Sequence, residues 1–392
     1  MKYDSVPLSE VCDLLAGYAF KSQHFGEYSD KVIKITNITP PTVDMNHLTG
    51  VDIKQYNIEK LKKYIVHRGD YVLAMTGATI GKIGRIHEGE AFINQRVLTF
   101  RPKSTIDADY LYYCLQGHYF SRYIINHIDS ESAQPNISAN TIGKYELALP
   151  NIDTQRNAAS FLKSLDDKIE LNNRINENLE QQAQAVFLQE FLSFDSVPVG
   201  WHKSSLLGIA DYLNGLAMQK FRPKDGEQGI PVLKIKELRQ GACDESSELC
   251  SPSIKPEYIV HDGDVVFSWS GSLLVDFWCG GDCGLNQHLF KVTSEKYDKW
   301  FYYAWTKHYL QEFAAIAADM ATTMGHIKRG ELSKAEVLIP PQAEYERIGG
   351  LLAPIYELII ANRIENRKLA ALRDTMLPKL MSGEINVSEV LT

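Results

Sequence analysis

The longest regular pattern in the chain is a heptad of apolar positions between Asn151 and Phe191. This segment contains no Gly and no Pro, so nothing in it interrupts a helix. Steps of four and three residues define one edge, a seam occupied by Ala158, Leu162, Leu165, Ile169, Asn172, Asn176, Leu179, Ala183 and Val186. At ~1.5 Å per residue such a helix would be a rod of roughly 60 Å. A rod with one apolar edge is unstable alone in water, so the pattern predicts a partner helix.

The same pattern returns 190 positions later in the chain. Its seam is occupied by Ile348, Leu352, Ile355, Ile359, Asn362, Asn366, Leu369, Arg373 and Met376. Gly349, Gly350 and Pro354 could kink the start of this copy. Because both copies carry two seam asparagines, we expect the helices to pair with each other in antiparallel orientation. The expected role of Asn172, Asn176, Asn362 and Asn366 is to specify the register of that pair. The alternative is that each helix packs separately on its own globular unit.

A fainter repeat precedes each helix and divides the chain. His67, Gly69 and Asp70 correspond to His261, Gly263 and Asp264. Ile93-Asn94-Gln95 corresponds to Leu285-Asn286-Gln287, and Asn136-Ile137 to His326-Ile327. The sequence therefore predicts a tandem that can fold about a pseudo-two-fold axis. Its expected parts are globular domains at 1–150 and 194–339 and spacer helices at 151–193 and 340–392.

Each globular unit is expected to mix short strands with short helices. In the first unit the patterns predict helices at 11–15, 107–116 and 119–127, and strands at 31–36, 70–75, 82–86, 91–101 and 146–149. Residues 39–68 are polar and are expected to form loops. Strands and helices do not alternate regularly, so the expected fold class is α+β. The whole chain would then comprise two similar mixed α/β domains separated by two long antiparallel coiled-coil helices.

Composition places the chain among ordinary globular proteins. It is 44% hydrophobic, has six Cys without the spacing of a disulfide framework, and contains no apolar run near the ~20 residues that span a membrane. The first residues do not resemble a signal peptide, so we expect a cytoplasmic protein with reduced thiols and no membrane partner. The net charge of −8 argues against a simple nucleic-acid binder. Residues 1–150 carry 16 basic and 16 acidic side chains, so binding to DNA would need local basic patches or a partner's charge.

Motifs that could carry chemistry are incomplete. The segment from Gly77 to Lys82 has three residues between its glycines where a phosphate loop has four, and Ile83 stands where that loop needs Ser or Thr. We expect instead a tight turn between strands, with Thr76, Thr79 and Lys82 facing outward. Cys279, Cys283 and His288 lack a fourth ligand for zinc, so no metal site is expected. Nucleophile-elbow, zinc-protease and amino-methyltransferase motifs are missing, so no catalytic residue is expected.

The two helical repeats carry a family resemblance. Their sequences are LDDKIELNNRINENL at 165–179, NRIENRKL at 362–369 and LRDTMLPKLMSGE at 372–384. In these motifs, and more weakly over its full length, the chain resembles the specificity (S) subunits of Type I restriction-modification systems. The resemblance implies a non-catalytic subunit with two target recognition domains, each binding one half of a split site in double-stranded DNA. It also implies that the helices set the half-site spacing and dock modification (methyltransferase) subunits, through which a restriction (translocase-nuclease) subunit joins. S-adenosylmethionine, ATP and Mg²⁺ would belong to those partners, and this chain would hold no cofactor.

Side-chain chemistry supplies candidates for DNA contacts. Arg, Lys, Asn and Gln suit base edges, whereas Ser and Thr suit phosphates. The candidates in the first unit are Lys21, Lys34, Thr76, Thr79, Lys82, Arg96, Gln134 and Asn136, and in the second Lys220, Arg222, Lys236, Trp269, Ser270, Ser272, His326 and Lys328. For each one the alternative is a solvated surface residue. Apolar residues outside the seam, namely Phe161, Leu171, Phe187 and Phe191, would either bind partners or pack on the adjacent unit. The alternative function is a two-domain scaffold or adaptor that does not bind DNA.

Overall fold

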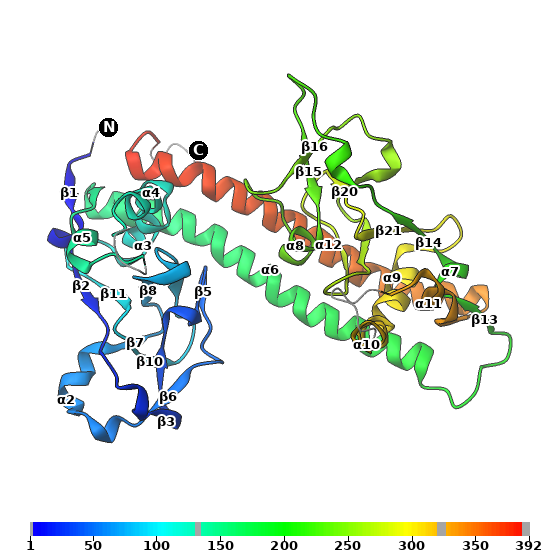
Figure 1. Cartoon of the computed structure of the whole chain (residues 1–392), viewed down its shortest axis with the longest axis horizontal. Helices are drawn as coiled ribbons and strands as arrows, with labels where there is room; N and C mark the ends of the chain where they lie inside the picture. Colours follow the sequence, from blue (N-terminus) through cyan, green and yellow to red (C-terminus); the bar gives the residue numbers. More distant parts are fainter. Residues whose placement is uncertain (1–2, 130–134, 320–326, 386–392) are drawn as a thin grey trace. The chain divides into compact units, whose positions relative to one another are not determined.

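The two long helices are shared between two compact units. The structure is a computed structural model, and it describes residues 3–129, 135–319 and 327–385. Unit 1 comprises residues 1–166 and 371–392, and unit 2 comprises residues 167–370. Both boundaries fall inside the long helices α6 (Ile152–Leu192) and α12 (Gln342–Ser382), so each unit contains part of both (Figure 1).

Both long helices form where the heptad pattern predicts them. The Asn151 side chain caps α6 by accepting a hydrogen bond from the Thr154 amide at 3.0 Å. Helix α12 has the same length of 41 residues and continues through its internal glycines and proline. Gly349 is needed there, because a Cβ at this position would lie 3.0 Å from the Trp300 indole nitrogen. The helix ends at Gly383, whose φ of +74° suits glycine.

Unit 1 contains three small sheets. The strand orders are β1-β12, β6-β3-β10-β7 and β2-β11-β8-β9-β5-β4. The strands are β1 (Ser5–Pro7), β2 (Cys12–Ala16), β3 (Phe25–Ile33), β4 (Ile38–Thr39), β5 (Thr42–Val43), β6 (Thr49–Val51), β7 (Ile65–His67), β8 (Tyr71–Ala74), β9 (Ile83–Arg85), β10 (Glu90–Ile93), β11 (Val97–Pro102) and β12 (Glu146–Ala148). The helices are α1 (Leu8–Val11), α2 (Ile58–Leu61), α3 (Ala108–Gln116), α4 (His118–Asn126) and α5 (Ala139–Gly143).

Unit 2 repeats this topology with sheets β13-β22, β14-β21-β18-β19 and β16-β15-β20-β17. Its strands are β13 (His202–Ser205), β14 (Asp211–Asn214), β15 (Ile230–Leu233), β16 (Leu249–Cys250), β17 (Ile259–Val260), β18 (Val265–Ser268), β19 (Leu274–Phe277), β20 (Cys283–Leu285), β21 (Leu289–Thr293) and β22 (Glu336–Ile339). Its helices are α7 (Leu206–Ile209), α8 (Ile235–Gln240), α9 (Lys299–His308), α10 (Leu310–Asp319) and α11 (Arg329–Lys334). Each sheet of unit 2 has a counterpart in unit 1 with the same strand order, except that β5 and β4 extend the larger unit-1 sheet, so the predicted α+β repeat is confirmed.

Three local predictions are wrong. The single strand expected at 91–101 is interrupted at residues 94–96, which separate β10 from β11. Residues 12–16 form strand β2 instead of a helix, because they pair antiparallel with β11 from Cys12–Pro102 to Ala16–Leu98. A strand partner more than eighty residues away outweighs the local preference for helix. Residues 39–68 were expected to be loops, but they contain β5, β6, β7 and α2.

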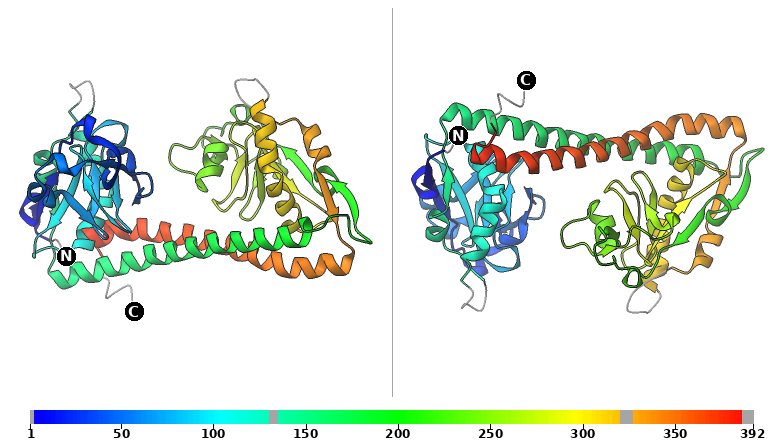
Figure 2. Two further views of the ribbon diagram at one scale, coloured as in Figure 1. Left: turned by 90° about the horizontal axis from the view of Figure 1, so that it is seen from below. Right: turned by 90° about the horizontal axis from the view of Figure 1, so that it is seen from above.

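Within each unit, the segments of α6 and α12 lie side by side and complete the core (Figure 2). The core of unit 1 includes Leu162 from α6 and Leu377 from α12. The core of unit 2 includes Phe187 and Phe191 from α6 and Ile348, Leu352 and Ile359 from α12. Phe187 and Phe191 pack edge to face against Trp305 of α9. These two phenylalanines therefore pack on the adjacent unit and are not available to a partner.

Candidate nucleic-acid interface

Three loops of unit 1 meet at the carboxyl ends of β8 and β10. They are residues 75–82, 94–96 and 135–138, and we call them the unit-1 loop cluster. The Met75 amide donates to the Arg96 carbonyl oxygen at 2.9 Å, and the Ile137 amide donates to the Met75 carbonyl oxygen at 3.0 Å. Gly77 and Gly81 have φ values of +75° and +80°, which allow the tight turn that the sequence predicts. Segments up to sixty residues apart in sequence thus form one edge.

Unit 2 builds its counterpart, the unit-2 loop cluster, from residues 269–273, 286–288 and 327–328. The Ile327 amide donates to the Trp269 carbonyl oxygen at 3.1 Å, as Ile137 does to Met75 in unit 1. The Trp269 ring lies 6.2 Å from the His288 ring, and Ser270 Oγ lies 3.2 Å from His288 Nδ1. The cluster therefore presents an aromatic and polar surface.

A shared backbone contact positions both clusters. Asn94 forms a parallel bridge with Tyr18 at the end of β10, and Asn286 forms the same bridge with Leu216 at the end of β20. A Cβ added to Gly17 would lie 2.2 Å from the Asn94 carbonyl oxygen. Gly215 makes the equivalent approach to Asn286 at 2.3 Å. The two units therefore hold different side chains on one scaffold.

Three of the four basic candidates of unit 1, namely Lys21, Lys82 and Arg96, are exposed, whereas Lys34 is half-buried. Lys82 and Arg96 are exposed, and no carboxylate of a described residue pairs with either. Arg96 Nη1 lies 3.4 Å from Asn136 Oδ1, a long hydrogen bond within the cluster. Lys21 is exposed beside Tyr56, and Lys34 Nζ lies 4.1 Å from the centre of the Phe25 ring.

The two threonines of the turn do not face outward as predicted. Thr76 is 8% exposed, and its hydroxyl donates to the Pro135 carbonyl oxygen at 2.8 Å. Thr79 is half-buried, with its hydroxyl oxygen inside the protein. The Thr76 hydroxyl thus stabilises the turn, whereas the buried Thr79 hydroxyl oxygen has no hydrogen-bond partner among the described residues. Only Lys82 of these three residues is exposed.

Several basic candidates of unit 2 are held by carboxylates. Arg222 lies 2.9 Å from Glu248, and Lys236 lies 3.2 Å from Asp244. Hydrogen bonds from Ser246, then Gln240 and Lys236, lower the pKa of Asp244. The charges of Arg222 and Lys236 are thus locally balanced. Ser270 is buried, whereas Lys220, Ser272 and Lys328 are exposed. The candidates Gln134 and His326 lie outside the described residues.

Sequence reasoning overlooked the two glutamines of the repeat. Gln95 is exposed in the unit-1 loop cluster, and Gln287 occupies the equivalent place in unit 2, with its Nε2 3.3 Å from His288 Nε2. Glutamine can form two hydrogen bonds with the major-groove edge of adenine, at N6 and N7. The signal was present in the Asn-Gln pair that recurs in both units, but a repeat alone does not separate a contact residue from a structural one.

The seam asparagines face each other within unit 2. Asn172 Nδ2 donates to Asn366 Oδ1 at 2.8 Å, and Asn362 Nδ2 donates to Asn176 Oδ1 at 2.9 Å. Residue numbers rise along one helix as they fall along the other, so the helices pair antiparallel in this unit. The role of these asparagines in fixing the register stays a prediction.

One side of the helix pair is fixed to the globular part of unit 2. Arg363 donates to Asp276 at 2.6 Å and to Glu180 at 2.9 Å. Arg367 donates two hydrogen bonds to Asp262, at 2.7 and 2.6 Å. Such charge-assisted hydrogen bonds are stronger than hydrogen bonds between neutral groups. They hold α12 on the sheet that carries the unit-2 loop cluster.

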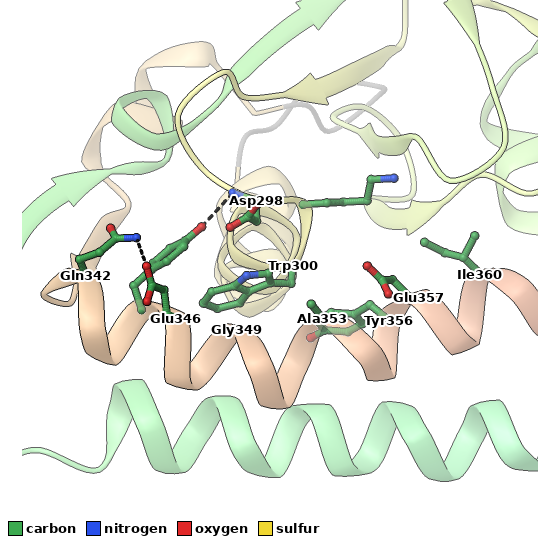
Figure 3. A pocket seen from close by; sticks show the side chains of 11 residues that line it. Asp298, Trp300, Gln342, Glu346, Gly349, Ala353, Tyr356, Glu357 and Ile360 are labelled. Atoms are coloured by element: carbon green, nitrogen blue, oxygen red, sulfur yellow. Dashed lines mark hydrogen bonds between the residues drawn. The ribbon is translucent and has the colours of Figure 1, made fainter.

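A cavity of about 570 Å³ lies beside α12 in unit 2, apart from the loop cluster (Figure 3). Trp300, Tyr345 and Tyr356 supply its aromatic wall. Its carboxylates come from Asp298, Glu346 and Glu357. Because this charge repels phosphates, the cavity is not part of the candidate nucleic-acid interface.

The described ranges carry neither a cluster of metal ligands nor a membrane-spanning helix. Within them, His, Cys, Asp and Glu form no group of three or more that could hold a metal ion. In the same ranges no helix combines the length and the apolar character required to cross a bilayer.

Comparison with protein families defines the class to which this arrangement belongs. Residues 1–181 and 198–372 match the model of the Type I restriction modification DNA specificity domain. The two matches cover both globular parts and most of both long helices. The chain belongs to this family, and it is a DNA specificity subunit of the type I restriction-modification class.

Individual relatives agree with this assignment. The chain is 26% identical over 343 residues to the specificity subunit of the type I restriction enzyme MjaIX of Methanocaldococcus jannaschii, covering 81% of this chain and 78% of that protein. It is 24% identical to the putative MjaX specificity subunit of the same organism, covering 97% and 93%. The crystal structure of the S subunit of a Type I restriction-modification system from M. genitalium has a TM-score of 0.58 at 13% identity, covering 97% and 96%. That likeness concerns the fold alone.

Proposed function

We propose that each unit reads one half of a bipartite site in double-stranded DNA through its loop cluster. The observation that carries this proposal is the recurrence of one loop scaffold with different side chains. Unit 1 offers Lys82, Arg96 and Gln95, whereas unit 2 offers Trp269, Gln287 and Lys328. Arg and Gln suit guanine and adenine edges, respectively, and Lys suits phosphates. Two similar readers with different contact residues would recognise two different short sequences.

The long helices, in this proposal, set the half-site spacing and dock modification subunits. In unit 2 the contacts to the globular part, from Glu180 to Lys307 and from Arg363 to Asp276, occupy one flank of the seam. Exposed apolar residues occupy the opposite flank, at heptad positions c and g: Leu171, Ile175, Leu351 and Leu358. Exposed leucines on a helix flank suit a partner helix.

The chemistry is proposed to reside in the partner subunits. Modification subunits would bind S-adenosylmethionine and transfer the methyl group, and a restriction subunit would use ATP and Mg²⁺. This chain would hold no cofactor and carry out no reaction. The modification subunits would also supply positive charge around the DNA, which a chain of net charge −8 needs.

Sequencing of methylated bases tests the proposal. The gene is expressed with its modification subunit in a host that lacks such a system, and the host methylome is compared with and without this chain. We expect a split methylated motif that depends on this chain. If active modification subunits leave the methylome unchanged when the chain is present, the DNA-reading proposal is wrong.

The alternative of a scaffold without a DNA role makes a different prediction. A scaffold should show no DNA affinity that weakens with salt. A DNA-binding protein with several phosphate contacts, in contrast, loses affinity steeply as the salt concentration rises. Membership of the DNA specificity family favours the proposal that the chain binds DNA.

A further inference from the structure

Two cysteines of unit 2 lie close together without being bonded. The sulfur atoms of Cys243 and Cys283 are 3.4 Å apart. A disulfide holds its sulfurs at about 2.05 Å, so an approach of roughly 1.4 Å would close the bond. Cys283 is fully buried at the start of β20, and Cys243 is partly exposed in the turn after α8. A solution thiol reagent can therefore reach Cys243 first.

The backbone around Cys243 can supply the required movement. Helix α8 ends at Gly241, which is exposed and has a φ of +72°. Side-chain hydrogen bonds around Asp244, from Ser246 and Lys236, hold the turn. Cys283, in contrast, is fixed in a strand that pairs with β15 on one side and β17 on the other. Closing the bond would draw the turn toward the sheet.

The two thiols also differ in acidity. In a thiol exchange pair the attacking thiol should be the more acidic one, and here that thiol is Cys243. The hydrogen shared between them lowers the pKa of Cys243 and raises the pKa of Cys283. Burial raises the pKa of Cys12 and Cys114 to about 12 and that of Cys279 to about 11. Cys243 is thus the thiol most readily converted to the nucleophilic thiolate.

We propose that Cys243 and Cys283 form a reversible redox pair that a small-molecule disulfide closes and a dithiol reopens. The Cys243 thiolate attacks one sulfur of the small disulfide, whose S–S bond breaks and releases one thiol. The Cys283 thiol then gives its proton to solvent, and its sulfur attacks the Cys243 sulfur. The second small thiol leaves, so two cysteines are oxidised and one small disulfide is reduced.

The pair is specific to unit 2. In the repeat, Leu285 corresponds to Ile93, so Cys283 corresponds to Ala91, and unit 1 has no thiol there. The closed bond would tie the turn beside Lys236 to β20, whose carboxyl end carries residues 286–288 of the unit-2 loop cluster. If the proposed function holds, oxidation changes affinity for the half-site of unit 2 and spares the other half.

The experiment titrates the full-length chain with oxidised glutathione and maps its thiols by differential alkylation and mass spectrometry. We expect the Cys243 and Cys283 peptides to become linked and to separate again with dithiothreitol. Cys283→Ala should trap one glutathione on Cys243, and Cys243→Ser should leave Cys283 reduced. Cys12, Cys114, Cys250 and Cys279 serve as internal controls that stay free. Both thiols remaining free, a stable glutathione on the wild-type chain, or a link from Cys243 to another cysteine overturns the proposal.

A second readout addresses DNA and is independent of the first. The complex with the modification subunit is measured on a duplex carrying its methylated site, oxidised and reduced, with Cys243→Ser as control. We expect oxidation to change the dissociation constant at least threefold in the wild type only. If Cys243 and Cys283 become linked but the DNA affinity does not change, the proposed effect of oxidation on DNA recognition is wrong. If the reduced complex binds no DNA, the proposed function is contradicted. The alkylation experiment then still tests the redox pair by itself.

Discussion

At the scale of single residues, the candidate arginines of the two units differ in how their charges are balanced. Arg96 in unit 1 has no carboxylate partner among the described residues, whereas Arg222 in unit 2 is held by Glu248. A guanidinium without a carboxylate partner breaks no ion pair when it turns toward a base or phosphate. A paired one must first give up its carboxylate. We therefore expect ionic contacts to dominate reading by unit 1, and stacking and hydrogen bonding to matter more in unit 2.

Arg96→Ala tests the contribution of the unit-1 loop cluster. It should weaken specific DNA binding by about 1–3 kcal/mol if Arg96 bonds a base, because a bidentate contact is lost. The methylated motif should then relax in one half only. Arg68→Ala is the matched control, since Arg68 is an exposed arginine in the turn before β8, at the opposite end of that strand. Equal losses in both variants would contradict a specific role for the cluster.

The contact between Arg367 and Asp262 predicts a dependence of stability on pH. The hydrogen bonds from Arg367 lower the pKa of Asp262 against the opposing effect of burial. A carboxyl whose pKa is lower in the folded state contributes stability above its unfolded pKa of about 3.9. That contribution is lost as pH falls through the folded pKa.

Arg367→Ala should therefore cost about 1–2 kcal/mol in the free energy of unfolding at pH 6, allowing for partial exposure of the pair. The difference from wild type should shrink below about pH 4. Urea denaturation from pH 2.5 to 7 measures it, with Arg347→Ala, which removes the ion pair between the more exposed Arg347 and Glu190, as control. A difference that stays constant over this range would refute the linkage.

At the scale of elements, the helix seam combines apolar packing with two polar layers. Asn172 and Asn366 form one layer, and Asn176 and Asn362 form the other. A buried amide is satisfied only when another polar group stands opposite, so a shifted register leaves it unpaired. Apolar layers accept several registers at similar cost. The asparagines are therefore expected to contribute specificity rather than stability.

Replacing all four seam asparagines with leucine tests this expectation. Resistance to urea should stay equal or rise, while the single register is lost, so that half-site spacing or the oligomeric state changes. Methylome sequencing and light scattering provide the two readouts. Asn178→Leu, on the exposed face of α6, is the control. Unchanged spacing together with an unchanged oligomeric state would show that other contacts fix the register.

Docking of a modification subunit is tested on the exposed flank of α12. Leu351→Ser with Leu358→Ser should weaken co-purification of the modification subunit at least tenfold, because the partner loses apolar area at about 25 cal/mol per Å². Thermal stability should change little, since both leucines are 45–46% exposed. Leu249→Ser, an equally exposed leucine on β16, should leave co-purification intact. A loss in the control and none in the double variant would exclude this flank.

At the scale of the whole molecule, the proposal predicts that helix length controls half-site spacing. Deleting residues 164–170 together with the facing residues 368–374 removes one heptad from each helix. The deletion takes away both partners of the Asp166–Arg373 ion pair and leaves the asparagine layers and Arg367 in place. Each helix shortens by about 10 Å, on the order of three base pairs of B-DNA. We expect a shorter spacer between unchanged half-sites in the methylome. An unchanged spacer would contradict the proposal that helix length sets the half-site spacing.

The sequence by itself determined the repeat, the two long helices and the equivalence of the turns at Asp70 and Asp264. These features rest on local periodicity or on a recurring motif, which many residues report together. Their signal adds up over 41 positions in each helix. The specificity-subunit family was likewise visible in the helical motifs, because those residues are contiguous.

Only the tertiary structure decided which side chains meet. Strand β2 forms because a partner strand lies far along the chain, and Phe187 and Phe191 are buried because α9 covers them. Thr76 turns inward to a carbonyl 59 residues away, and Cys243 meets Cys283 across 40 residues. Such contacts depend on the packing of segments distant in sequence, and burial and hydrogen-bond partners exist only after that packing. The same residue type can therefore be a contact, a cap or a core residue, and its neighbours in space determine which.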